Sequence, residues 1–465
     1  MKKDHITVRE AAFIGVGAMV GAGIFALLGE AGAVAGAAVW LSFLLAGVVA
    51  AFQGYSFAKF GARFPSAGGL LEYVARGFGD GHVTGAACWL TYASNIVVTA
   101  LVAVSFGSYA AASFVGDDAG AVWVKVFAAA ILLVMLAVNV VGSGAVAKVQ
   151  SVIVWIVVGI LLLFAVVTIV NMDPSLLAPS RYPGVREIVS SIALTFFAFL
   201  GFGIVTFTAK DLRDPARELP RAMYLALGIA TITYVAVALG VFGTLTVQEV
   251  ISSGGTAIAV AAKPTLGDLG FWLMSLTGLF ATAGATNSGI YPAGDLSIDL
   301  AAHGRFPPMF GRHVRRAPVG MLVMVGATLV LTVAFNLSAI ASIGSAVALL
   351  IFSSVTLGHI RVRNETGARL LPLLIGVLTT TVTLVVFVTT TLVHEEGAMA
   401  ALGAIVALSI GLELWWSTAR PRRSAARAER PAEQTPERSR AFELAGPEER
   451  DTSEDGIRPA TGDRP

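Results

Sequence analysis

Hydrophobic residues occur along this chain in about twelve long runs, separated by short polar or charged breaks. A helix that crosses a bilayer needs about 20 consecutive apolar residues, and most of the runs have about that length. The spacing predicts helices over 11–34, 39–57, 83–114, 121–141, 149–170, 188–209, 223–245, 271–300, 319–335, 340–360, 370–392 and 399–416. The pattern therefore indicates an all-α, polytopic membrane protein.

Composition agrees with this pattern. Hydrophobic residues make up 56% of the chain, charged residues make up 13%, and the mean hydropathy is +0.78, which excludes an ordinary soluble domain. Cys88 is the only cysteine, which excludes an intrachain disulfide and a cysteine-based metal site. We expect Cys88 to fill space inside an apolar helix.

The basic residues predict the orientation. An even number of spans places both ends of the chain on one side of the membrane, and lysines and arginines gather on the cytoplasmic side of membrane proteins. With the ends inside, the outer segments hold only Lys125, Arg181, Arg186 and Lys263. We therefore expect cytoplasmic termini in a multi-pass protein of the cell membrane, either inner or plasma.

The two ends of the chain differ from the apolar part. Residues 1–10 are expected to form a short cytoplasmic N-terminus that is retained, because no convincing cleavage site follows it. Residues 417–465 are rich in Arg, Glu and Pro and have few large apolar side chains. Such a segment cannot bury a core, so we expect a disordered cytoplasmic tail.

The first run is unusually rich in glycine, with Gly15, Gly17, Gly21 and Gly23 in nine positions. Glycine inside a helix costs roughly 1 kcal/mol relative to alanine, so the run is expected to break at Gly21 to Gly23. Two interpretations remain open. The break either exposes backbone groups to a ligand, or the glycines allow helices to pack closely.

A second interrupted run favours the ligand interpretation. The sixth run contains Gly201 and Gly203, and it crosses the membrane in the direction opposite to the first. Interrupted helices in corresponding positions of two halves indicate a transporter site at the membrane midplane. This predicts inverted repeats over 11–170 and 188–360, followed by two extra helices over 370–416.

Broken helices would supply charge without charged side chains. Amide groups that begin a half-helix attract a carboxylate, and carbonyls that end one attract an ammonium. The amides at the first break would bind the carboxylate of a substrate. The carbonyls beside both breaks would accept hydrogen bonds from its ammonium group. The phenylalanines would contact its side chain. The expected substrate-binding residues are Met19, Gly21, Ala22, Gly23, Ile24, Phe197, Ala198, Phe199, Leu200 and Phe202.

Five short motifs carry a resemblance to a known family. They are Gly21-Ala22-Gly23-Ile24-Phe25, residues 64–69 before Glu72-Tyr73, residues 196–202, residues 213–221 and residues 303–310. In order and spacing the chain resembles the amino acid–polyamine–organocation permeases over roughly residues 6–416. The resemblance implies a LeuT-like five-plus-five fold with discontinuous helices 1 and 6, alternating access, and transport of amino acids or related amines. It also places the carboxylate-binding backbone on Gly21 to Gly23 and a gating aromatic on Phe197.

Departures from the family bear on the coupling ion. Proton-coupled members often carry a lysine midway along the fifth helix, and the corresponding residue here is Val157. Sodium could bind the hydroxyls of the eighth segment, although lone hydroxyls in such helices usually bond the preceding turn. These hydroxyls belong to Thr282, Thr286 and Ser288.

Another departure is a charge pattern near the cytoplasmic side. Lys210 and Asp295 stand where family members often carry the opposite charges, which suggests an inverted ion pair. Asp299 lies four residues beyond Asp295, so the two carboxylates could instead share a proton. Alternatively, each aspartate pairs with a basic residue of an inner loop.

Taken together, these features predict a secondary amino acid permease that works by proton symport or by exchange. No acidic side chain is placed in the expected site, which favours neutral or apolar amino acids over cationic ones or polyamines. A non-transporting sensor of the same fold is the alternative from another class. The sequence contains no nucleophile paired with a base, no metal-binding cluster and no nucleic-acid motif. We therefore expect a small-molecule substrate and lipid as partners. We expect no cofactor beyond a coupling proton or sodium ion.

Overall fold

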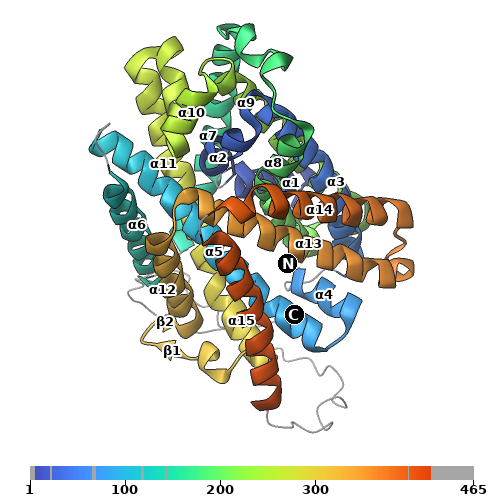
Figure 1. The fold of residues 1–465 in the computed structure, drawn as a ribbon. Helices are drawn as coiled ribbons and strands as arrows, with labels where there is room; N and C mark the ends of the chain where they lie inside the picture. Colours follow the sequence, from blue (N-terminus) through green and yellow to red (C-terminus); the bar gives the residue numbers. More distant parts are fainter. Residues whose placement is uncertain are drawn as a thin grey trace, which may run out of the picture. The chain divides into compact units, whose positions relative to one another are not determined.

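The computed structural model describes residues 6–20, 23–64, 70–116, 120–141, 144–395 and 397–419. These residues are almost entirely helical, as predicted (Figure 1). Ten of the described helices are long and apolar enough to cross a membrane, and the helix Val319–Ala334 is apolar but shorter. The hydrophobic runs therefore fold as the all-helical membrane protein that their length indicates.

In the first part of the chain, most helices follow the expected runs. They are α1 (Val8–Val20), α2 (Gly23–Ala35), the 3-10 turn η1 (Gly36–Ala38), α3 (Val39–Arg63), α4 (Leu70–Phe78), α5 (His82–Phe114), α6 (Ala121–Val141) and α7 (Gly144–Val170). The expected break at Gly21 to Gly23 falls at Gly21 and Ala22, which lie outside the described residues between α1 and α2.

The second part contains the remaining helices and a two-residue strand pair. It comprises η2 (Pro174–Leu177), η3 (Pro179–Arg181), α8 (Val185–Phe197), η4 (Leu200–Asp211), α9 (Pro215–Phe242), α10 (Val247–Ser253), η5 (Gly254–Thr256), α11 (Ala257–Ala302), η6 (Pro308–Gly311), β1 (His313–Val314), β2 (Ala317–Pro318), α12 (Val319–Ala334), α13 (Leu337–Thr366), α14 (Leu370–Thr390), η7 (Leu392–His394) and α15 (Ala398–Ala419). The antiparallel strands pair His313 with Pro318 and Val314 with Ala317.

Helix α11 is much longer than its expected run of 271–300. It continues across a kink at Gly267, whose φ of 63° is a left-handed conformation that side chains rarely adopt. The kink separates a shorter N-terminal part of α11 from the apolar part that corresponds to the predicted span.

The interrupted helices lie in the buried part of the molecule. Helix α1 packs on η4 and α9, and α2 packs on α8.

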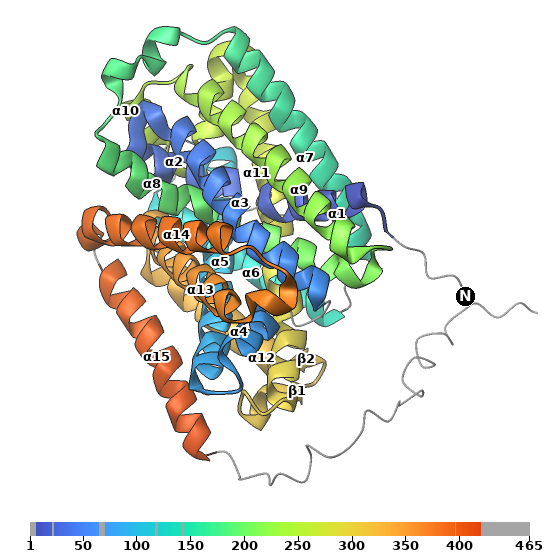
Figure 2. The ribbon, with the colours of Figure 1, turned by 90° about the vertical axis from the view of Figure 1, so that its right-hand side faces the viewer.

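Helix α14 lies alongside α13 in both views (Figures 1 and 2). Large apolar side chains on α6 and α7 are exposed instead, including Leu133, Trp155 and Leu163, as expected for helices that face lipid.

Candidate substrate site

The start of α2 touches the end of α8. A Cβ atom built on Gly23 would lie 2.6 Å from the Tyr234 Oη and 2.8 Å from the Ala198 carbonyl oxygen. Real side chains do not approach so closely, so only glycine lets the two helix ends meet here. The fold thus brings together the first and sixth runs, although Gly23 and Ala198 stand 175 positions apart in the sequence.

The glycine that follows this junction is also a close-packing position. A Cβ on Gly201 would lie 2.5 Å from the Ala18 carbonyl carbon and 2.6 Å from the Met19 nitrogen. By contrast, a Cβ on Gly203 would meet only the Phe57 ring, at 3.9 Å. The packing interpretation therefore applies to Gly201, where backbone rather than a movable side chain limits the space.

The change of helix type in the sixth run lies upstream of its glycines. Helix α8 ends at Phe197, and the amides of Ala198 and Phe199 donate to the carbonyls of Thr195 at 3.1 Å and Phe196 at 2.9 Å. These bonds tighten the chain into the 3-10 helix η4, which contains Gly201 and Gly203. The break expected at these glycines is therefore displaced to Ala198 and Phe199.

Backbone polar groups converge at this junction. Gly23 and Ile24 are the first described residues of α2, and Gly21 and Ala22 directly before them are not described. The Ala198 carbonyl accepts from the Tyr234 hydroxyl at 3.1 Å. Gly23 of α2 therefore lies beside the carbonyl end of α8, which is the negative end of that helix dipole.

The Phe197 ring lies against two other helices. A Cβ on Gly344 of α13 would stand 2.6 Å from the ring and 3.1 Å from the Val97 side chain of α5. Phe197 is 5% exposed. It therefore fills the space between α8, α5 and α13, which is a suitable position for an aromatic gate.

Other predicted site residues are buried, but their contacts differ. Met19, Ile24 and Ala198 are buried at the junction, whereas Leu200 is partly exposed. Gly21 and Ala22 lie outside the described residues.

Two predicted site phenylalanines pack into aromatic clusters. Phe199 packs on Tyr234 with ring centroids 5.1 Å apart. Phe202 packs between Phe57, at 5.5 Å, and Phe352, at 5.2 Å. Both rings are fully buried, so in this conformation they contact protein on every side.

The hydroxyls proposed for sodium bond to their own helix. Thr282 donates to the Gly278 carbonyl at 2.6 Å, Thr286 donates to Thr282 at 2.8 Å, and Ser288 donates to Gly284 at 3.0 Å. This is the alternative that the sequence left open for lone hydroxyls. Among the described residues, no three His, Cys, Asp or Glu side chains gather to hold a metal ion.

The suggested inverted ion pair does not form in this conformation. Lys210 and Asp295 are both exposed, and the ion pairs of the described chain do not join them. Asp299 lies 3.3 Å from His303, one helical turn further on. The aspartate that was expected to share a proton with Asp295 therefore has a histidine partner instead.

A double charge reversal tests this arrangement. We expect Lys210→Asp and Asp295→Lys to act additively on the melting temperature, because additivity holds for side chains that do not interact. Thermal unfolding of both single variants and the double variant in detergent measures the coupling energy. A rescue of the single variants in the double variant would show that the pair forms after all.

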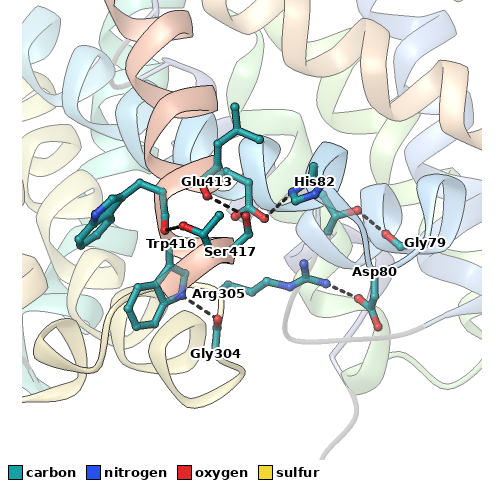
Figure 3. A network of polar contacts seen from close by, with 12 residues as sticks. Gly79, Asp80, His82, Gly304, Arg305, Glu413, Trp416 and Ser417 are labelled. Carbon is teal, nitrogen blue, oxygen red and sulfur yellow. Dashed lines mark hydrogen bonds and ion pairs between the residues drawn. The ribbon is translucent and has the colours of Figure 1, made fainter. Parts of the chain in front are cut away.

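Two residues from the motif 303–310 belong to a polar network at one end of α5 (Figure 3). The Trp416 indole of α15 donates to the Gly304 carbonyl at 3.0 Å, and Arg305 pairs with Asp80. In the same network, the buried Glu413 carboxylate lies 3.5 Å from the His82 ring. This network links α15, the loop after α11 and the start of α5.

Sequence reasoning missed several residues of the site. Tyr234 satisfies the Ala198 carbonyl, and Val97 and Gly344 form the surface on which Phe197 rests. Each lies in an ordinary apolar run, where no local pattern distinguishes it from its neighbours.

Two polar side chains of α5 bond across helices. Asn95 donates to the Gly289 carbonyl, and Tyr92 donates to the Gly320 carbonyl.

Comparison with known proteins adds to this geometry. A family described as amino acid permease matches residues 6–417. The chain is 32% identical over 400 residues to the inner membrane transport protein YbaT of Escherichia coli. This alignment covers 86% of this chain and 93% of the relative. It is 25% identical over 314 residues to a methylthioribose transporter of Bacillus subtilis, with 64% of this chain and 67% of the relative covered. It is 26% identical over 249 residues to the branched-chain amino acid permease BcaP of Bacillus subtilis, with 50% and 54% covered.

Proposed function

Because the chain belongs to the amino acid permease family, we propose that it carries amino acids across the cell membrane by alternating access. It is a multi-pass membrane transporter and not an enzyme. The relative named as an inner membrane transport protein supports the proposed location.

The proposed architecture has twelve spans in a five-plus-five inverted repeat. Residues 11–170 form the first repeat, residues 188–360 form the second, and residues 370–416 add two helices. Residues 1–10 and the tail 417–465 lie in the cytoplasm, since the basic residues gather on that side. The change from α8 to η4 in the sixth run supports the LeuT-like arrangement that the family implies, in which the first run also breaks.

One observation carries the function, namely the contact between the start of α2 and the end of α8. Gly23 of α2 lies against the Ala198 carbonyl at the end of α8, and the proposed break of the first run at Gly21 and Ala22 would present the α2 amides beside it. A zwitterion presents a carboxylate and an ammonium close together, so it complements these two poles. We assign the carboxylate to Gly21, Ala22, Gly23 and Ile24 and the ammonium to carbonyls near Met19 and Phe197.

The proposed substrates are neutral amino acids, particularly those with apolar side chains. The described residues around the junction, including Val97, Phe197 and Gly344, carry no charge that would hold a second cation. Among the relatives, one is named a branched-chain amino acid permease and another a methylthioribose transporter. A neutral, apolar substrate is consistent with both the site and the first of these names.

Transport by the purified protein tests this proposal. The full chain is reconstituted in liposomes, and uptake of labelled leucine, alanine, arginine and putrescine is measured with and without proton and sodium gradients. We expect leucine or alanine to accumulate at least ten-fold above empty liposomes, and unlabelled neutral amino acids to compete. Accumulation of arginine or putrescine alone would reverse the substrate assignment, and binding without uptake would indicate a sensor.

A further inference from the structure

Helix α15 carries one acidic side chain, Glu413, on the face that packs against α5. Leu402, Ser409 and Glu413 are buried and recur at the spacing of one helix face. Leu414 and Trp415 are exposed on other faces of the helix. A carboxyl group that is buried in a membrane span is costly, so such residues are rare and usually serve a function.

The Glu413 carboxyl group lies directly on the backbone of α5. A Cβ atom built on Gly85 would overlap this carboxyl group, so glycine is what lets α15 approach so closely. At the first residue of α5, the His82 Nδ1 lies 3.5 Å from the Glu413 Oε1, and the two side chains point toward one another (Figure 3). His82 is 67% exposed and Glu413 is 2% exposed. The histidine therefore connects a buried carboxyl group to solvent.

The charge across this contact depends on one proton. Histidine is a cation only when it is protonated, and it changes its charge between about pH 5 and pH 8. With the proton, His82 and the Glu413 carboxylate form an ion pair. Without it, the contact loses an attraction that is stronger at a buried group than in water, because the dielectric constant there is lower. We therefore expect α15 to dock on α5 more tightly at acidic pH.

Other charged groups near this contact have partners of their own. Arg305 pairs with Asp80, and His303 pairs with Asp299. The buried His359 of α13, a helix that also packs on α15, hydrogen-bonds two hydroxyl groups. The remaining titratable or charged groups of the elements packed on α15 are Arg361, Arg363 and Glu365 of α13, and at the opposite end of α15 His394 and Glu395, which accepts a hydrogen bond from Ser338 at 2.6 Å.

The same end of α15 holds the loop that follows α11. The Trp416 indole, three residues beyond Glu413, donates to the Gly304 carbonyl of this loop at 3.0 Å. Phe306 of the loop stacks on Trp89 of α5, with ring centroids 3.9 Å apart. The loop is therefore held by α5 and by α15, and movement of α15 would release it from one of the two.

We propose that His82 and Glu413 form a proton-operated latch that fastens α15 and the loop after α11 to the start of α5. Protonation of His82 closes the latch. Loss of this proton at higher pH lets the end of α15 move away from α5. In the orientation proposed above, His82 lies on the cytoplasmic side, so the latch responds to the pH of the cytoplasm.

The single cysteine of the chain offers a direct readout of this latch. Cys88 is 2% exposed and lies three residues beyond Gly85, on the same side of α5. Its rate of modification by a maleimide, divided by the rate in the unfolded chain at the same pH, measures how often Cys88 is uncovered. We expect this ratio to rise roughly five-fold or more between about pH 5.5 and pH 8 in the full-length protein.

Variants of the two latch residues assign the effect. Glu413→Gln keeps the size of the side chain and removes its charge, so the ratio should no longer change with pH. His82→Lys keeps a positive charge at both pH values, so the ratio should stay low. Asp299→Asn is the matched control, because it breaks the other histidine–carboxylate pair, in which the side chains are 71% and 61% exposed. It should behave as the wild type.

Thermal unfolding in detergent shows whether each variant folds, and His82→Lys changes only an exposed side chain if Glu413→Gln does not. A wild-type ratio that does not change with pH would overturn the proposal. The same holds if Glu413→Gln keeps the wild-type dependence on pH, or if Cys88 becomes accessible at high pH in His82→Lys. The measurement does not depend on transport, so its failure leaves the proposed function intact, and a lack of leucine uptake leaves the latch intact.

Discussion

Replacing Gly23 with alanine is expected to weaken binding of every transported amino acid alike, by roughly five-fold to 150-fold. The added Cβ would lie 2.6 Å from the Tyr234 Oη and 2.8 Å from the Ala198 carbonyl oxygen. Forcing one methyl group into such a contact costs about 1–3 kcal/mol, which corresponds to that range. The start of α2 would move away from α8, and the two poles that bind the zwitterion would separate.

Gly203→Ala is the matched control for this substitution. It makes the same chemical change beside the same junction, but its Cβ would meet only the Phe57 ring at 3.9 Å. We expect its substrate affinity to stay within about two-fold of the wild type. Competition binding with a panel of amino acids, together with thermal unfolding to show that both variants fold, measures the difference.

The pattern across substrates decides between backbone binding and side-chain selection. If the α2 amides hold the carboxylate, Gly23→Ala reduces affinity by a similar factor for each amino acid. The bulkier Gly23→Leu should abolish binding of them all. A variant at this position that kept its affinity and changed its preference would contradict the assignment.

Phe197→Leu is expected to slow transport at least five-fold while changing equilibrium binding less. The ring spans the gap to Gly344 and Val97, and the shorter leucine cannot fill it. Removing part of a buried ring costs less than the roughly 3–5 kcal/mol of a full Phe→Ala truncation, so the protein should remain folded. The slower rate would reflect an occluded state that closes poorly over the substrate.

The adjacent Phe196 supplies the control for this prediction. Phe196 is fully buried on the same helix and packs edge-on against Phe352, with ring centroids 5.7 Å apart. Phe196→Leu should lower the melting temperature about as much as Phe197→Leu, yet keep initial uptake rates within about two-fold of the wild type. Equal slowing in both variants would assign the effect to core packing rather than to a gate.

Much of the fold could be predicted from local pattern. The runs 83–114, 121–141, 319–335 and 370–392 became α5, α6, α12 and α14 with ends that differ by at most two residues. Backbone groups in lipid have to be satisfied within their own helix, so the length and hydropathy of a run largely decide its structure. The break expected at Gly21 to Gly23 stays a prediction, because Gly21 and Ala22 lie outside the described residues.

Other elements of the site depended on partners far along the chain. The glycines of the sixth run predicted a break at their own positions. Gly201 is instead required because the α1 backbone packs directly against it. The change of helix type lies upstream, at Ala198 and Phe199. The hydroxyl of Tyr234 reaches the Ala198 carbonyl from α9. Such contacts follow from how helices pack after they form, which no periodicity along one helix can indicate.

The sequence by itself determined that this chain is a helical membrane protein, that its sixth run is a weak point, and that its family is recognisable. These properties depend on residues close together in the chain, where hydrophobicity and glycine content act directly on the backbone. Only the tertiary structure decided that Gly23 meets Ala198, that Lys210 and Asp295 stay apart, and that Ser338 bonds Glu395. Each of these depends on the direction in which side chains from distant helices point once those helices have packed.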